Sequence, residues 1–390
     1  MTPVPLAALH QVLFGGLENY ALLAIPFFVF AGDLMGRSGI SERLISFALA
    51  VVGRVPGSLG VATVSASAVM GAVSGSSVAA VAALSKTLYP RLVAGGYGQQ
   101  RAGGLIASAG AIDIVIPPSI AMILFGLAAE QSIPRLFVGG ILPGLLMAAM
   151  MCGFVVVSAW REGIPTEGRF DAAQVLRAGR AALAALLMPV FVLGGIYTGV
   201  FSPTEAGGFA CLYAILVARF VYRTMTFADI LETAGASALL SARIMVIVAT
   251  AGLVIWVLTT QGVPQALVAF IDHLDMSRVV FLLAVNVGLL VIGCFLDPTS
   301  AILVFAPLLV PVAVSLGVDP VHFGIIMTVN LAIGMFTPPF GLNLFVAQSV
   351  TGLPVQTLYR GVLPFVAVLI CALLVITYVP ALSLALWRPI

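Results

Sequence analysis

Long uncharged runs of apolar residues follow one another from Leu22 to Trp387 with only short gaps. A helix that crosses a bilayer core needs about 20 such residues, and roughly ten to twelve segments approach this length. Only 8% of the residues are charged and 61% are hydrophobic, which excludes an ordinary soluble domain. The alternation typical of membrane β-strands is missing from the sequence. We therefore predict an all-α polytopic membrane protein.

Residues that carry enzymatic chemistry are few and scattered. The four cysteines and three histidines lie far apart, and the cysteines sit inside apolar runs. We interpret the cysteines as packing residues rather than disulfides or metal ligands. No cluster of His, Asp and Glu or activated nucleophile is visible, so we expect no enzyme and no cofactor. No block of basic residues suggests nucleic acid.

The chain repeats itself. Gly39-Ile40 matches Gly262-Val263, and the same offset of 223 residues carries Ser76-Ser77 onto Thr299-Ser300. After a two-residue deletion, Pro117-Pro118 falls on Pro338-Pro339. Glycine and proline mark backbone geometry, so two units of the same fold are predicted, although chance matches in a Gly- and Pro-rich chain are the alternative. We divide the chain into an N-terminal unit (1–150), connecting scaffold helices (151–242) and a C-terminal unit (243–390).

Basic residues differ between the two units. The first carries Lys86, Arg91 and Arg101 after its serine-rich stretch, whereas the second has no Lys or Arg between Arg278 and Arg360. Because basic connections favour the cytoplasmic side, equivalent connections are expected on opposite faces. Such an inverted repeat is typical of secondary transporters. The polar stretches 161–180 and 223–243 predict amphipathic segments at the interface, or ordinary loops.

Each unit contains a short polar break between apolar arms, SGSS at 74–77 and DPTS at 297–300. The arms have only about 15 residues, too few for a comfortable crossing. We predict two re-entrant hairpins, at about 56–90 and 280–317, with polar turns facing protein or water. The alternative is that the small residues serve helix packing.

A double proline follows each hairpin, within 111–120 and 333–343. Two prolines disrupt the helical ladder, so broken helices are predicted at about 104–130 and 321–350, with ordinary proline kinks as the alternative. Freed carbonyls, with the hydroxyls of Ser119 and Thr337, are hard oxygen ligands that suit Na⁺. Helix N-termini at the tips suit a carboxylate.

Few ionisable residues lie within the apolar runs. Asp113 and Asp297 adjoin the breaks and are functional candidates, whereas Asp33 is expected to be structural. Asn343 can contact substrate or form a hydrogen bond inside the protein. Glu205 follows a Pro-Thr pair and is expected to cap a helix.

Several long motifs resemble the large membrane subunit of tripartite ATP-independent periplasmic (TRAP) transporters. They are LLAIPFFVFAGDLM, GAVSGSSVAAVAAL, IVIPPSI, GIYTGVFSPTEAGG, DPTSAILVFAPLLVPV and GVDPVHFGIIMTVNLAIGMFTPPFGLNLFVA. The resemblance runs from about residue 20 to the C-terminus. It implies an elevator-type, Na⁺-driven importer of organic acids, such as dicarboxylates, keto acids or sialic acids, in the bacterial inner membrane. It also implies two protein partners, a small four-helix membrane subunit and a periplasmic substrate-binding protein.

The same resemblance implies the positions of the binding sites. One Na⁺ site would involve Ser74, Gly75, Gly110, Asp113 and Pro117. The other would involve Gly293, Gly334, Thr337 and Phe340. The substrate would lie among Ser76, Ser77, Ser119, Thr299, Ser300 and Asn343.

The opening residues differ from the family pattern. Members usually carry a further membrane helix ahead of this segment, and MTPVPLAALHQVLFGGLENY is too polar to replace it. Three other functions remain open from the residues alone: a carrier that needs no partners, a membrane-embedded enzyme and a channel. The substrate itself cannot be read from the sequence.

Overall fold

The computed structural model describes residues 6–53, 55–164 and 171–386, and within these ranges every regular element is a helix. Seven of the described helices are long and apolar enough to span a membrane, or eight if the bent pair α6–α7 forms one span. This confirms the all-α polytopic class. The number is lower than the ten to twelve apolar segments of the sequence because several of those segments form helices shorter than a span.

The helices have the following bounds: α1 Leu6–Gly15, α2 Ala24–Arg37, α3 Ile40–Val52, α4 Ser58–Ser74, α5 Ser77–Ala94, α6 Gln99–Val115, α7 Ile120–Ala128, α8 Ile133–Glu162, α9 Ala172–Tyr197, α10 Pro203–Leu216, α11 Phe227–Thr260, α12 Val263–His273, α13 Arg278–Gly293, α14 Pro298–Ser315, α15 Pro320–Gly334, α16 Leu342–Thr351, α17 Val355–Tyr378 and α18 Ala381–Leu384.

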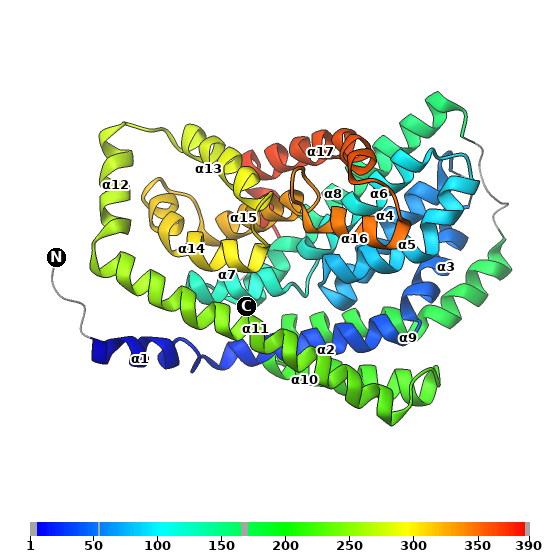
Figure 1. Cartoon of the computed structure of the whole chain (residues 1–390), viewed down its shortest axis with the longest axis horizontal. Coiled ribbons are helices and arrows are strands. Elements are labelled where there is room, and N and C mark those ends of the chain that lie inside the picture. The colour runs from blue at the N-terminus through cyan, green and yellow to red at the C-terminus, as the bar shows by residue number, and fades with distance from the viewer. Residues whose placement is uncertain (1–5, 54, 165–170, 387–390) are drawn as a thin grey trace.

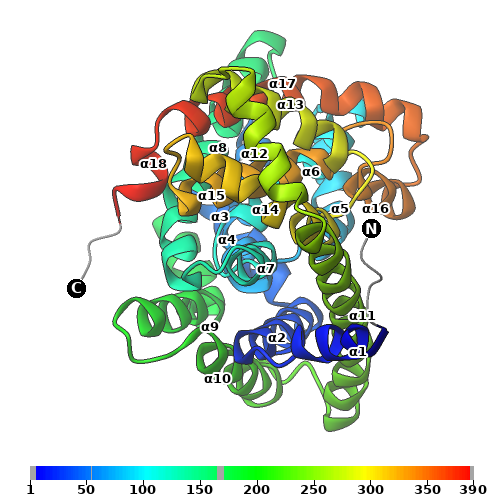
Figure 2. The same cartoon turned by 90° about the vertical axis from the view of Figure 1, so that its left-hand side faces the viewer.

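The helices lie in two layers. Figures 1 and 2 show α1, α2, α9, α10 and α11 along one side of the molecule, with the helices of both predicted hairpins and broken helices in the layer above. Helix α2 packs on α10 and α11 within the lower layer, and it also reaches α4 of the upper layer. The upper layer therefore contains the predicted sites, and α2 is the lower-layer helix that approaches the first of them.

Helix order repeats along the chain. The sequence from α2 to α8 has the same succession of helices as the sequence from α11 to α17, and the 223- and 221-residue offsets align a start or an end of each pair to within about three residues. The glycines before α3 and α12, Gly39 and Gly262, both have a φ of 71°. Figure 1 places α3 and α5 at one end of the long axis and their equivalents α12 and α14 at the opposite end.

The centre of the upper layer is built from α6 and α15. Every residue of α6 from Ala102 and every residue of α15 from Val321 is buried. A helix that is apolar all round must be covered by other helices. Around α6 pack α4, α5 and α17, and around α15 pack α13 and α14. The first half of each broken helix thus packs against both arms of its own hairpin.

The two units also interlock at the breaks. The second half of the second broken helix, α16, packs on α5 of the first hairpin, while α7 packs on α14 of the second. Each hairpin is therefore held by a broken helix from each unit.

Two of the predicted boundaries fall inside helices. The boundary at 150/151 lies within α8 and the one at 242/243 lies within the 34-residue α11. The composition changes along α11 while its backbone hydrogen bonds continue, so polarity alone marks no end of the helix. The polar stretch 161–180 contains the end of α8 and the start of α9, and its residues 165–170 lie outside the described part of the chain.

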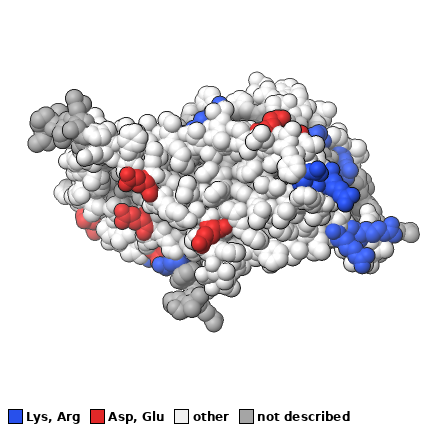
Figure 3. Space-filling model, turned by 90° about the horizontal axis from the view of Figure 1, so that it is seen from below, with Lys and Arg blue, Asp and Glu red and all other residues white. Residues whose placement is uncertain are grey.

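Charges divide along the long axis. On the face shown in Figure 3, most Lys and Arg lie at the right-hand end and most Asp and Glu lie in the left half. Figure 1 has α3, α5 and α9 at that right-hand end, and these helices carry Arg43, Lys86, Arg91, Arg177 and Arg180. We call this the basic end. Basic residues favour the cytoplasmic side of a membrane.

Candidate functional site

The first predicted tip is a true break between two helices. Helix α4 ends at Gly75, whose φ of 59° is left-handed and suits glycine, and Ser76 caps α5 by accepting a hydrogen bond from the Ala79 amide. A Cβ at Gly75 would lie 2.6 Å from the carbonyl oxygen of Pro118. The first tip therefore rests directly on the first double proline.

Asp113 lies below this tip, near the end of α6. Its side chain is fully buried, and its Oδ2 accepts a hydrogen bond of 3.1 Å from the Ser74 hydroxyl. Its other oxygen, Oδ1, is buried and has no hydrogen-bond partner among the described residues. Gly71 of α4 allows this approach, since a Cβ there would lie 3.0 Å from Oδ1. A buried carboxylate with an unpaired oxygen is costly unless a cation or proton compensates it.

Four of the five residues predicted for the first Na⁺ site lie around this point. Ser74 and Asp113 are hydrogen-bonded, Gly75 touches Pro118, and Pro117 is the neighbour of Pro118 in the chain. Gly110 has different neighbours, because a Cβ there would lie 3.0 Å from Ser77 Oγ and 3.1 Å from Asn343 Nδ2.

The second tip packs against the end of α15 and the segment that follows it. A Cβ on Gly334 would lie 2.4 Å from the carbonyl carbon of Gly293, so two glycines let α13 and α15 touch. The Thr337 amide donates to the Gly334 carbonyl at 3.1 Å, and the rings of Phe295 and Phe340 lie 5.5 Å apart. The four residues predicted for the second Na⁺ site are thus close neighbours.

Asp297 begins the second arm of this hairpin. It caps α14 and accepts hydrogen bonds from the Ser300 amide at 3.2 Å and the Ser300 hydroxyl at 2.6 Å. Pro298 occupies the first turn of α14, where a missing amide proton costs little, so it starts this helix rather than breaking it. Thr299 and Ser300 are half-buried at the tip.

A buried polar pair joins the two units. Ser77 donates to Asn343 Oδ1 at 2.8 Å, and Asn343 Nδ2 donates to the Ala107 carbonyl at 3.2 Å. Of the two roles open to Asn343, the internal hydrogen bond is present in this structure. Ser119, also buried, caps α7 through the Met122 amide. Ser76, Thr299 and Ser300 are therefore the predicted substrate residues that are partly exposed.

We expect Asn343→Ala to lower the free energy of unfolding by about 1–3 kcal/mol, because it leaves the buried Ser77 hydroxyl without its partner. Thermal unfolding of the purified protein in detergent measures this. Ser77→Ala completes a double-mutant cycle, and the double variant should lose little more than Asn343→Ala alone. Fully additive losses would contradict a direct bond.

Two acids outside the breaks have structural partners. Glu205 forms a capping box with Ser202 at the start of α10, which confirms its predicted role. Asp33 on α2 accepts a 2.6 Å hydrogen bond from Ser237 of α11. This agrees with the structural role expected for Asp33, and it ties α2 to the lower layer.

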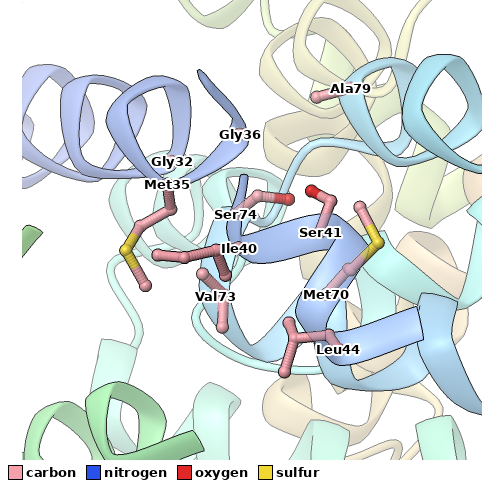
Figure 4. A pocket seen from close by; sticks show the side chains of 10 residues that line it. All are labelled: Gly32, Met35, Gly36, Ile40, Ser41, Leu44, Met70, Val73, Ser74 and Ala79. Carbon is pink, nitrogen blue, oxygen red and sulfur yellow. The ribbon is translucent and has the colours of Figure 1, made fainter. Parts of the chain in front are cut away.

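Gly32 is a site residue that the sequence did not single out. A Cβ at Gly32 would lie 2.9 Å from the carbonyl oxygen of Ser74, so α2 touches the first tip backbone to backbone. The sequence feature that could have identified it is the pair Gly32 and Gly36, which lie one helical turn apart and allow close helix packing. Beside this contact lies a cavity of about 20 Å³, and Figure 4 shows Ser41 and Ser74 facing it.

Comparison with known proteins identifies the family of this chain. The family model described as "Tripartite ATP-independent periplasmic transporter, DctM component" matches residues 1–382. The C4-dicarboxylate TRAP transporter large permease protein DctM of Pseudomonas aeruginosa is 42% identical over 99% of this chain and 90% of its own length. The 2,3-diketo-L-gulonate TRAP transporter large permease protein YiaN of Escherichia coli is 37% identical over 95% of this chain and 88% of its own.

A solved structure shares the fold. The YdaH transporter of Alcanivorax borkumensis superposes with a TM-score of 0.65 at 16% identity, covering 98% of this chain and 90% of that one. Since the family model covers nearly the whole chain and the similarity to whole permease subunits extends over both hairpins, this protein belongs to the DctM family, the large permease component of tripartite ATP-independent periplasmic transporters.

Proposed function

We propose that this protein imports an organic acid, of the C4-dicarboxylate class, across the bacterial inner membrane with Na⁺ as the coupling ion. It works with the small membrane subunit and the periplasmic binding protein of a tripartite system. The observation that carries the Na⁺ assignment is Asp113, a buried carboxylate with one free oxygen, placed against the first tip by Ser74.

The surroundings of Asp113 supply oxygen ligands of the kind that Na⁺ prefers. The Ser74 hydroxyl binds one carboxylate oxygen, and the Pro118 carbonyl faces Gly75. Binding a cation here would compensate the buried charge and hold the tip on the broken helix. The second tip offers hydroxyl and carbonyl oxygens around Thr337. Its one carboxylate, Asp297, accepts hydrogen bonds from Ser300 and would have to leave them to bind a cation.

The substrate class follows from the tips and from the relatives. Ser76 caps α5 at its N-terminus, where helix amides and the helix dipole favour an anion. At the start of α14 the Asp297 carboxylate already takes this position. The half-buried hydroxyls of Ser76, Thr299 and Ser300 add hydrogen-bond donors. The similar P. aeruginosa protein is named for C4-dicarboxylates, and we extend that class to this chain.

An elevator motion fits the two layers. Helix α2 is tied to α11 by hydrogen bonds from Ser237 to Asp33 and from Arg37 to Glu232. Its contact with the first tip is the close packing of Gly32 on the Ser74 backbone. We propose that the lower layer stays fixed with the small subunit while the hairpins and broken helices move together along it.

Reconstitution tests this function. Proteoliposomes with both membrane subunits should accumulate labelled succinate when a Na⁺ gradient and the loaded binding protein are supplied. Uptake that persists without the binding protein would indicate a stand-alone carrier. Flux that does not saturate would indicate a channel, and uptake unaffected by replacing Na⁺ with K⁺ would exclude Na⁺ coupling.

Thr337→Ala should raise the Na⁺ concentration for half-maximal uptake about tenfold, equivalent to about 1.4 kcal/mol for one lost oxygen ligand. In this structure the Thr337 hydroxyl donates to the Ile333 carbonyl at 2.7 Å. Thr250→Ala is the matched control, because that hydroxyl makes the same kind of bond, to Val246, on the exposed face of α11. Equal Na⁺ dependence in both variants would argue against the second site.

A further inference from the structure

A second hollow adjoins the first tip. A cleft of about 380 Å³ lies between α2 and α3 on one side and α5 on the other. It shares Gly32, Gly36, Ser41 and Ala79 with the small cavity beside Ser74. The two hollows therefore adjoin at these four residues, which Figure 4 labels among the lining of the smaller one.

The wall formed by α5 is built from small residues with one cation. Ala79, Ala82, Ala83 and Lys86 line the cleft, at the spacing of a single helix face. Alanine side chains leave the space open. Lys86 lies nine residues after Ser77, about 14 Å along the axis, toward the basic end.

The charges that face the cleft differ in whether they have partners. Arg37 pairs with Glu232 at 3.1 Å, and Asp33 accepts the bond from Ser237. Glu42 on α3 is exposed at the opposite wall. Lys86 is exposed and, within the described part of the chain, makes no hydrogen bond or ion pair. Its ammonium group is thus available to an anion.

The aligned positions of α14 in the second unit are apolar. The 223-residue offset aligns Ala82 and Lys86 with Phe305 and Leu309 of α14. Both line a cavity of about 290 Å³ between α12, α13 and α14, and all residues lining it are apolar or glycine. The positive charge of Lys86 therefore does not follow from the repeated fold.

We propose that the cleft along α5 is the water-filled path between the first tip and the basic end, and that Lys86 is the residue that attracts the acid anion into it. This inference rests on the proposed function, since it assumes an anionic substrate. The basic end is cytoplasmic by its charge, so the path is the one by which imported substrate leaves.

Cysteine labelling tests the path without requiring transport. Ala83→Cys, in a variant whose four native cysteines are replaced by alanine, is treated with anionic and cationic methanethiosulfonates of equal size. Both should react from the cytoplasmic side of oriented vesicles. Lys86→Gln should lower the ratio of anionic to cationic rates about tenfold, because a unit charge a few ångströms from the thiol changes the local concentrations of the two reagents in opposite directions.

The controls isolate the charge of Lys86. Lys86→Arg should keep the ratio, and so should Arg91→Gln, which removes an exposed cation of α5 that does not line the cleft. Glu42→Gln should raise it. A ratio unchanged in Lys86→Gln, or labelling from the periplasmic side alone, overturns the proposal. Failure of Na⁺-driven uptake in the unmodified protein would instead refute the proposed function. The labelling rates would still show whether the cleft is open to water and whether Lys86 attracts anions.

Discussion

Asp113→Asn is expected to abolish Na⁺-driven uptake and to raise the Na⁺ concentration needed for binding at least about 100-fold. Removing the charged partner of a buried pair costs about 3 kcal/mol or more, and this equals about a hundredfold in affinity. The asparagine keeps the size of the side chain and can still form a hydrogen bond with Ser74. The loss of Na⁺ affinity therefore measures the contribution of the negative charge. Uptake in proteoliposomes at graded Na⁺ measures it.

Thermal stability separates this role from a merely structural one. Na⁺ that binds the folded wild type should raise its unfolding temperature with rising Na⁺ concentration. In Asp113→Asn this shift should become smaller, because only the second proposed site still binds Na⁺, while stability in Na⁺-free buffer should increase because a buried, half-satisfied carboxylate is gone. Asp272→Asn, at an exposed acid of α12, should behave as wild type. An intact Na⁺-dependent shift in Asp113→Asn would refute the site.

Gly75→Val is expected to reduce uptake about 100-fold, since a displacement of about 1 Å at a binding site can have an effect of this size. Valine at a φ of 59° is strained, and its Cβ would lie 2.6 Å from the Pro118 carbonyl oxygen. The first tip must then move off the broken helix, and the oxygens around Asp113 separate.

Gly153→Val provides the matched control for this substitution. Gly153 lies on the exposed face of α8, and a Cβ there would meet nothing within 4 Å. The control should transport normally and elute from size-exclusion chromatography as wild type. If Gly75→Val elutes normally and also transports normally, the tip does not need to rest on Pro118.

Much of the architecture was predictable from local features of the sequence. The breaks at Gly75 and at the two double prolines follow from backbone chemistry within a few residues, and the structure has helix ends at each. Repetition of glycines and prolines at a constant offset likewise predicted the repeated succession of helices. The boundaries between the three predicted regions were harder to predict, because a change in polarity does not interrupt the backbone hydrogen bonds of α8 or α11.

The sequence by itself determined that this chain is a polytopic helical membrane protein with two interrupted, repeated units, since apolar length and helix breaking act over short stretches of chain. Which groups meet was decided only by the tertiary structure. Ser74 reaches Asp113 across 39 residues and Ser77 reaches Asn343 across 266. Such contacts depend on how closely whole helices approach, and this is set by the packing of small residues such as Gly32 and Gly71 against neighbouring backbones.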